Sequence, residues 1–336
     1  MHEETIFLNE KLNKSELDYD EEGQIINTEM VTAMEGVPDL NLLITGNISG
    51  IIKFWKLFDN KEVEEQINYL TNPNIHIGQI RCITYIKTER KQLLFTGGED
   101  TYLIMITIHK NNLWSINKFN KFPNNRINKP ITGVINSICD INDGKHVFYN
   151  IGSRLAGFDI TLRELTVLKE YQSEVINMMS YVTELKLLIY ATDKIKAIDP
   201  INSSIIYSIS LDIPIQSFFN CILNGVQYFI TSSRKVVENS LQSEITYFTF
   251  VDNVFRKTSN YTVNGDIIKL IYCYDLRSFV IVLKEGLFYL QNIENENVKK
   301  KLYYDQTPFT NGCYLGDGMN LVFATNEGKL DFFKCY

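Results

Sequence analysis

The side chains that most often transfer protons near neutral pH are histidines, and the chain of 336 residues has four of them. They are spread singly along the sequence, as His2, His76, His109 and His146. The chain contains no H-E-x-x-H metal motif, no G-x-S-x-G nucleophile motif and no glycine-rich phosphate-binding loop. We therefore expect a protein that is not an enzyme and that carries no cofactor and no catalytic metal.

The six cysteines are a second source of reactive side chains, but no two of them form a C-x-x-C pair. Zinc sites usually need such close pairs, so a metal site is not predicted. Five cysteines instead lie in separate apolar segments, where a small thiol packs well. These five are Cys82, Cys139, Cys221, Cys273 and Cys313. We expect structural free thiols in a reducing compartment.

The apolar segments recur along the chain in a common pattern. Each copy is an apolar strand, a short polar turn and a second, alternating strand, as in LLITGNISGIIKFWKL at residues 42–57. Further copies lie at residues 92–108, 145–160, 185–199, 226–233, 277–292 and 320–334. Another strand precedes each copy across a turn, and a more polar fourth strand follows most of them. Four strands that recur every roughly 40 to 50 residues are typical of β-propeller blades.

This pattern predicts an all-β fold, a single seven-bladed β-propeller of four-stranded antiparallel blades. No long window has the apolar periodicity of a helix, which argues against an α/β fold. The last repeat ends after its third strand, and the strand-like segment at residues 4–12 is expected to supply the fourth and close the ring. The expected blades are residues 25–70, 76–120, 131–172, 173–212, 213–260, 264–305 and 308–336, with residues 3–12 joining the last.

Three of the repeats resemble WD repeats. His76 precedes an inner strand and Asp100 follows the second strand, as in such repeats. Trp55 in one repeat, and Phe158 with Asp159 in another, stand where a WD repeat has its Trp-Asp pair. The chain thus resembles a WD-repeat (WD40-like) propeller with degenerate repeats. The resemblance implies that these five residues are structural, with His76 making hydrogen bonds rather than transferring protons.

Charge and hydropathy limit the cellular setting. The net charge of −7 and the pI near 5.3 argue against a general nucleic-acid binder, which needs a basic face. No segment reaches the roughly 18 uninterrupted apolar residues of a membrane-spanning helix. The first residues are acidic, unlike a secretory signal. We expect a cytoplasmic protein that is neither secreted nor transmembrane. A cytoskeletal or nuclear location is compatible with this expectation.

Two long connections are the candidates for partner binding, because function in a propeller concentrates on loops that a stiff ring holds. One is the basic connection at residues 117–133, and the other is the segment at residues 232–244, expected as a loop between two strands of blade five. Both are expected at the same end of the ring. Their candidate contact residues are Lys118, Phe119, Lys121, Phe122, Arg126, Lys129, Arg234 and Lys235. The alternative is that both are ordinary solvated insertions.

These features favour a non-catalytic scaffold that binds other proteins as a subunit of a larger eukaryotic assembly, for instance a cytoskeletal, ciliary or trafficking complex. Aromatic and arginine side chains are frequent interface anchors, and a basic loop would attract an acidic partner. One alternative is a glycosidase-like propeller enzyme with carboxylates near the axis, such as Asp140, Asp193 or Asp275. A second is a lipid or nucleic-acid adaptor that uses the basic connection.

Overall fold

Short strands and tight turns alternate through the computed structural model of the chain. The described residues form no α-helix, and none of them belongs to a helix that is long and apolar enough to cross a membrane. The structure describes residues 3–6, 18–19, 25–26, 30–57, 63–65, 75–108, 114–119, 133–170, 175–192, 194–211, 214–237, 240–252, 254–294, 299–304, 307–316 and 320–334.

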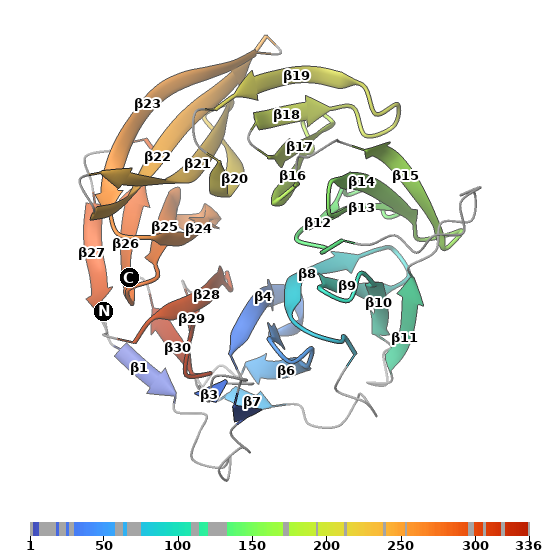
Figure 1. The fold of residues 1–336 in the computed structure, drawn as a ribbon, viewed down its shortest axis with the longest axis horizontal. Coiled ribbons are helices and arrows are strands. Elements are labelled where there is room, and N and C mark those ends of the chain that lie inside the picture. The colour runs from blue at the N-terminus through green and yellow to red at the C-terminus, as the bar shows by residue number, and fades with distance from the viewer. Residues whose placement is uncertain are drawn as a thin grey trace.

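Seven four-stranded sheets stand side by side around a common axis (Figure 1). All paired strands within them are antiparallel, and in the first six blades the four strands follow one another from the axis outwards. The all-β, seven-bladed propeller predicted from the sequence is confirmed.

The first three blades are built from successive strands. Blade 1 contains β4 (Val31–Val37), β5 (Leu42–Asn47), β6 (Ile52–Leu57) and β7 (Val63–Glu65). Blade 2 contains β8 (Ile80–Lys87), β9 (Gln92–Gly98), β10 (Leu103–Ile108) and β11 (Trp114–Phe119). Blade 3 contains β12 (Ile138–Asp140), β13 (His146–Ile151), β14 (Arg154–Asp159) and β15 (Glu164–Glu170).

Blades 4 to 6 repeat this order. Blade 4 contains β16 (Met178–Val182), β17 (Leu187–Ala191), β18 (Lys194–Ile198) and β19 (Ile205–Ser210). Blade 5 contains β20 (Ile215–Leu223), β21 (Val226–Val237), β22 (Ser240–Val251) and β23 (Val254–Asn264). Blade 6 contains β24 (Ile267–Cys273), β25 (Ser278–Leu283), β26 (Leu287–Asn292) and β27 (Lys299–Tyr304). Two 3-10 turns, η2 (Pro38–Leu40) and η3 (Tyr274–Leu276), follow β4 and β24.

Blade 7 is closed by the beginning of the chain. It contains β28 (Phe309–Tyr314), β29 (Asn320–Thr325) and β30 (Leu330–Lys334), and β1 (Glu3–Ile6) is its outermost strand. β1 pairs antiparallel with β30, with Glu4 opposite Phe332 (Figure 1). The prediction that the N-terminal strand closes the ring is confirmed. β2 (Asp18–Tyr19) and β3 (Ile25–Ile26) form a separate two-stranded sheet between β1 and blade 1.

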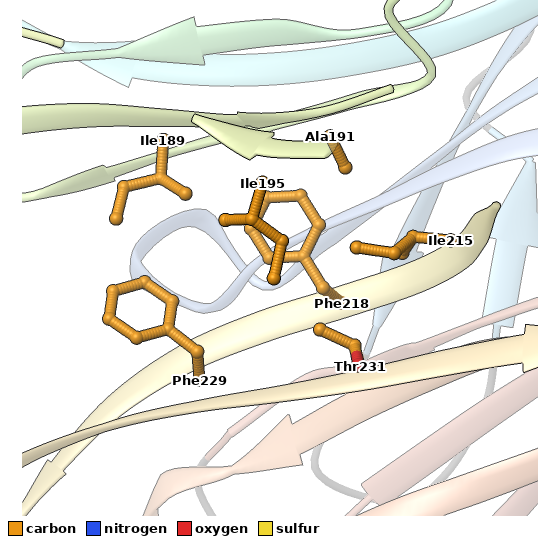
Figure 2. A pocket seen from close by; sticks show the side chains of 7 residues that line it. All are labelled: Ile189, Ala191, Ile195, Ile215, Phe218, Phe229 and Thr231. Carbon is orange, nitrogen blue, oxygen red and sulfur yellow. The ribbon is translucent and has the colours of Figure 1, made fainter. Parts of the chain in front are cut away.

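The core lies between the faces of neighbouring blades. All six residues of β25 and all five of β17 are buried, because a strand in the middle of a blade is covered on both faces. Figure 2 shows one such contact, where Ile189 of blade 4 and Phe218 and Phe229 of blade 5 line an apolar gap. This gap has no space for a water molecule, so it belongs to the packed core and is not a ligand site.

Blade 5 differs from the expectation. The segment at residues 232–244, predicted as a loop, continues the strands β21 and β22, with Arg234 opposite Ser243 and Val236 opposite Leu241. β23 extends with them, pairing Asn264 with Gln242. The loop prediction was wrong because polar residues can form a strand when they pair across a hairpin, as Lys235 does with Gln242. The side chains of Arg234, Lys235 and Ser240 are exposed, so a strand here costs no burial of polar groups.

Candidate functional site

The inner strands of all seven blades begin at the same end of the ring, because every blade has the same strand order. The turns between the second and third strands of each blade emerge at this end as well. We call it the upper end; β21 and β22 of blade 5 end and begin there, with Val237 opposite Ser240. β11 also ends at the upper end, at Phe119, so the predicted connection at residues 117–133 starts there, while residues 120–132 lie outside the described residues.

At the upper end, the chain leads into each inner strand through two equivalent positions. The residue at the first position is apolar and buried, with no more than 5% of its surface exposed. The first-position residues are Val31, Ile80, Ile135, Ile176, Ile215, Ile267 and Phe309. The second-position residues that follow are Thr32, Arg81, Asn136, Asn177, Gln216, Ile268 and Thr310. In blades 1, 2, 5, 6 and 7 the strand register shifts at this position, and such a bulge redirects a side chain out of the ladder.

Three second-position side chains bind a backbone carbonyl of the next blade. Thr32 Oγ1 donates to Ile80 O at 2.6 Å, and Thr310 Oγ1 donates to Val31 O at 2.7 Å. The side-chain amide of Asn136 donates to Ile176 O at 3.4 Å. In each case the acceptor is the first-position carbonyl of the following blade, so these bonds tie neighbouring blades together at the upper end.

Blade 2 carries a buried network beside this ring of bonds. His76 Nδ1 lies 2.7 Å from Asp100 Oδ1, and His76 Nε2 lies 2.8 Å from Thr96 Oγ1. Because a carboxylate only accepts, His76 Nδ1 carries a proton and donates it to Asp100. Burial would raise the pKa of Asp100, but the bond from His76 and the N–H groups of Ile77 and Tyr102 outweigh it and hold the pKa below its usual range.

The remaining positions of WD-repeat type are also internal. Trp55 Nε1 donates to Thr45 Oγ1 at 2.9 Å in blade 1. Phe158 is fully buried, and Asp159 accepts the backbone N–H groups of Thr161 and Leu162 in a turn at the opposite end. All five residues singled out by the WD-repeat resemblance thus make structural contacts within or between blades.

The upper end is open across blades 4 to 6. The side chain of Asn177 makes no hydrogen bond to any described residue, although Asn136 at the same position of blade 3 does. Ile268 at this position of blade 6 has no polar group. Between these two residues lies a pocket of about 360 Å³, which we call the upper pocket. Its lining includes Asn177, Ile215, Gln216, Arg234, Asp266 and Ile268.

An ion pair forms one wall of the upper pocket. Arg234 Nε donates to Asp266 Oδ1 at 3.1 Å, and its Nη2 donates to Asp266 Oδ2. The Asp266 side chain is 5% exposed, whereas that of Arg234 is 50% exposed. The side-chain amide of Gln216 also donates to Asp266, at 3.4 Å, while Gln216 Oε1 is buried without a partner among the described residues. The carboxylate is thus paired, and hydrogen-bonding capacity remains on Gln216, Asn177 and Arg234.

The predicted contact residues divide between surface and core. Lys235 is exposed next to Arg234 on the blade-5 hairpin. The ammonium group of Lys118 donates to Ile75 O and lies 5.9 Å from the ring centre of Tyr102, so its charge already has contacts within the chain.

Phe119, predicted as an exposed anchor, is half-buried, with its ring centre 4.6 Å from that of Phe158. That expectation was wrong because Phe119 is the last residue of β11, opposite Leu103. Lys121, Phe122, Arg126 and Lys129 lie outside the described residues.

The candidate catalytic carboxylates do not form a pair in the described part of the chain. Asp140, at the end of β12, accepts the N–H of Asn142, and burial raises its pKa. Asp275, in η3 of blade 6, accepts the hydroxyl of Tyr314 at 2.8 Å. Asp193 lies outside the described residues. Each of the two described carboxylates has a turn or packing role in a different, non-adjacent blade.

The inner strands contain titratable groups that the sequence analysis missed or treated only as packing. Burial raises the pKa of Glu35 in β4 to about 7, although the N–H of Tyr85 and the nearby Lys269 lower it in part. Burial also raises the pKa of Cys139 and Cys313 to about 12, so these free thiols stay protonated. The described residues include no group of His, Cys, Asp and Glu side chains able to hold a metal ion.

Comparisons with known proteins give the fold a class. No family model matches the sequence, and no curated protein sequence matches it. Among solved structures, the chain is similar to the WD40 domain of Pan2 from Neurospora crassa. The identity is 11% and the TM-score 0.64, over 90% of this chain and 88% of that one. The chain therefore has the fold of a WD40-type β-propeller, as its repeats indicated. Since 1389 chains of solved structures match, this fold does not by itself choose a function.

Proposed function

We propose that the chain is a non-catalytic scaffold that binds other proteins as a cytoplasmic subunit of a larger eukaryotic assembly, through the upper end of blade 5. The observation that carries the proposal is the blade-5 hairpin tip, which we define as residues 234–237 and 240–243. Its strands β21 and β22 have 12 residues each, against five to seven in the second and third strands of the other blades.

The hairpin tip combines an apolar pair with two cationic side chains. Val236 is 68% exposed and Leu241 is 36% exposed, and the two stand opposite each other across the hairpin. Arg234 and Lys235 precede them on β21. An exposed apolar pair rimmed by charge is a frequent contact surface, and arginine is enriched among interface anchors. Cationic residues on an acidic protein favour an acidic partner surface.

The hairpin is stiff enough to present a fixed surface. β21 pairs with β22 as far as Val237 and Ser240, and β23 supports β22 as far as Asn264. A partner that binds a preformed strand pair loses little additional conformational entropy in ordering it. This favours the hairpin as a docking element of the scaffold.

The test compares the hairpin with exposed apolar residues at the opposite end of the ring. We expect the double variant Val236→Asp and Leu241→Asp to capture its partners from the source cell at least about 10-fold less well than the parent chain. The matched control is Leu162→Asp with Ile201→Asp, at positions that are 66% and 90% exposed in turns of blades 3 and 4. Affinity purification followed by mass spectrometry measures both.

The proposal is contradicted if the control loses the partners and the hairpin variant keeps them. It is also contradicted if Arg234 and Lys235 are needed only for salt-dependent binding to anionic vesicles, which would favour the lipid-adaptor alternative. Unfolding in urea serves as the check on folding, and both double variants are expected to remain within about 1 kcal/mol of the parent, because the changed side chains are exposed.

A further inference from the structure

We propose that the upper pocket binds a neutral peptide amide, contributed by an extended segment of the partner protein. The inference rests on the proposed function and adds the chemical class of what the scaffold recognises. The pocket lies where the inner strands of blades 4, 5 and 6 begin, at the base of the blade-5 hairpin.

The first argument is the comparison of equivalent positions around the ring. Where Thr32, Asn136 and Thr310 stand, the second-position side chain is used to bind the next blade. Asn177 has the same side chain as Asn136, yet its donor and acceptor meet no described residue, and it lines the pocket. A carboxamide that ties two blades together elsewhere is therefore available to a ligand here.

The second argument is the buried oxygen of Gln216. Its side-chain nitrogen is oriented by Asp266, which places Oε1 on the other side, buried without a hydrogen-bond partner among the described residues. A buried acceptor that lacks a donor costs about 1 to 3 kcal/mol. A ligand N–H that enters the pocket and reaches Oε1 would remove this cost.

The third argument is charge. Arg234 is neutralised by Asp266, and the backbone N–H of Asp266 is itself bound by Glu285 Oε1 at 3.1 Å. A phosphate or carboxylate would therefore meet one paired arginine beside two carboxylates. A neutral amide meets no such repulsion, and its C=O and N–H match the Arg234 and Asn177 donors and the Gln216 acceptor.

The fourth argument is shape. A volume of about 360 Å³ is near the lower end of the range of ligand pockets, roughly 300 to 1,000 Å³, so it admits a short stretch of chain rather than a folded surface. Ile268 is half-buried in its wall, and Ile215 and Ile267 lie beneath it, 2% and 0% exposed. The walls therefore favour an amide that carries an apolar side chain.

The experiment titrates the full chain, labelled at the δ1 methyl groups of isoleucine, with N-acetyl-L-leucine N-methylamide. The two anionic comparison probes are N-acetyl-L-leucine and inorganic phosphate. We expect saturable shifts of the Ile215, Ile267 and Ile268 methyl signals with the N-methylamide, at an affinity on the order of millimolar for so small a ligand. Neither anion is expected to produce them.

Variants then assign the contacts. Asn177→Ala and Gln216→Leu are each expected to weaken binding of the N-methylamide at least about 5-fold, the effect of one lost hydrogen bond. Asn136→Ala is the matched control, since it makes the same change at the same position of blade 3, outside the pocket, and is expected to bind as the parent does. Ile80 and Ile104 belong to blade 2 and not to the blades that line the pocket, so their methyl signals report whether each variant is folded.

Two results would overturn the inference: no saturable shift of the pocket methyl signals, or tighter binding of an anion than of the amide. Unchanged binding by both Asn177→Ala and Gln216→Leu would also overturn it. The hairpin double variant separates this inference from the proposed function. If that variant loses its partners while the amide does not bind, only the pocket assignment fails; if the amide binds while the variant keeps its partners, only the hairpin assignment fails.

Discussion

Two sectors of the ring, blades 1 and 2 and blades 4 to 6, share the same strand pattern. They differ in the contacts that their residues make at the upper end. In the first sector, Thr32 bonds to the next blade, and His76, Asp100 and Thr96 form a buried network. In the second sector, the side chain of Asn177 makes no hydrogen bond to a described residue, the side chain of Ile268 has no polar group, and a pocket lies between them.

The two sectors also differ in sequence at the place where neighbouring blades meet. A Cβ on Gly46 or Gly97 would lie 2.7 Å or 2.3 Å from the side chain of Ile80 or Ile135, so glycine lets the next blade approach closely. The same place in blade 5 is occupied by Ser232, which pairs with Ser217. The opening is confined to the upper end, because deeper in the ring Ser217 accepts the N–H of Leu270 of blade 6 at 2.9 Å.

The comparison teaches that a propeller has many equivalent places, and the binding that we propose lies where this equivalence fails. Closed positions stabilise the ring, and open positions leave hydrogen-bonding groups for a partner. Substitutions in the closed sector should therefore act mainly on stability, and the same substitutions in the open sector mainly on binding.

The largest expected effect is on the closed sector. His76→Ala should lower the free energy of unfolding by about 3 kcal/mol, because it leaves the buried groups of Asp100 and Thr96 without their partner. Urea unfolding followed by tryptophan fluorescence measures the loss. His146→Ala is the control, since the His146 side chain is 43% exposed beside Asp143, and it should cost less than about 1 kcal/mol. Equal losses from the two variants would mean that the blade-2 network is not a special source of stability.

The next effect depends on pH and concerns Glu35, in the inner strand of blade 1. Burial raises its pKa from 4.5 to about 7, so the folded chain holds a proton that the unfolded chain has released between these values. The free energy of unfolding should therefore fall as the pH rises from 4.5 to 7, and stay low above 7. Glu35→Gln keeps an acceptor for the N–H of Tyr85 and removes the charge.

We expect Glu35→Gln to be more stable than the parent by about 2 kcal/mol at pH 8, with a smaller difference at pH 5. Urea unfolding at the two pH values measures the change. Glu89→Gln, at an exposed position, serves as the control and should show no such dependence. A difference for Glu35→Gln that is the same at both pH values would show that the carboxyl does not titrate in this range.

The sequence was sufficient for the ring and for its closure, because period and alternation repeat in every blade. It identified His76, Asp100 and Trp55 as structural, since their spacing resembles WD repeats. It also singled out Arg234 and Lys235, although as members of a loop, and their role in partner binding stays a prediction. The strands β21 and β22 were missed because polar residues such as Ser232 and Arg234 read locally as a turn, whereas pairing with Ser217 and Asp266 depends on distant parts of the chain.

The upper pocket and Glu35 could not be predicted in the same way. The pocket depends on Asn177 lacking a partner that Asn136 has, and no local pattern distinguishes the two Ile-Asn pairs. For Glu35 a signal existed, since a glutamate inside the apolar run MVTAMEGV breaks its pattern. Its raised pKa, however, comes from the blades that surround β4. Equivalent positions become different only through their neighbours in space.

The smallest expected effect compares these two asparagines directly. Asn136→Ala removes the bond to Ile176 O and should lower the free energy of unfolding by about 1 kcal/mol. Asn177→Ala removes no bond to a described residue and should change it by less than about 0.3 kcal/mol. Paired urea titrations of the two variants can resolve the difference, because the substitution and its strand position are the same. If Asn177→Ala proves as costly as Asn136→Ala, then Asn177 is held within the fold, and the upper end of blade 4 is as closed as that of blade 3.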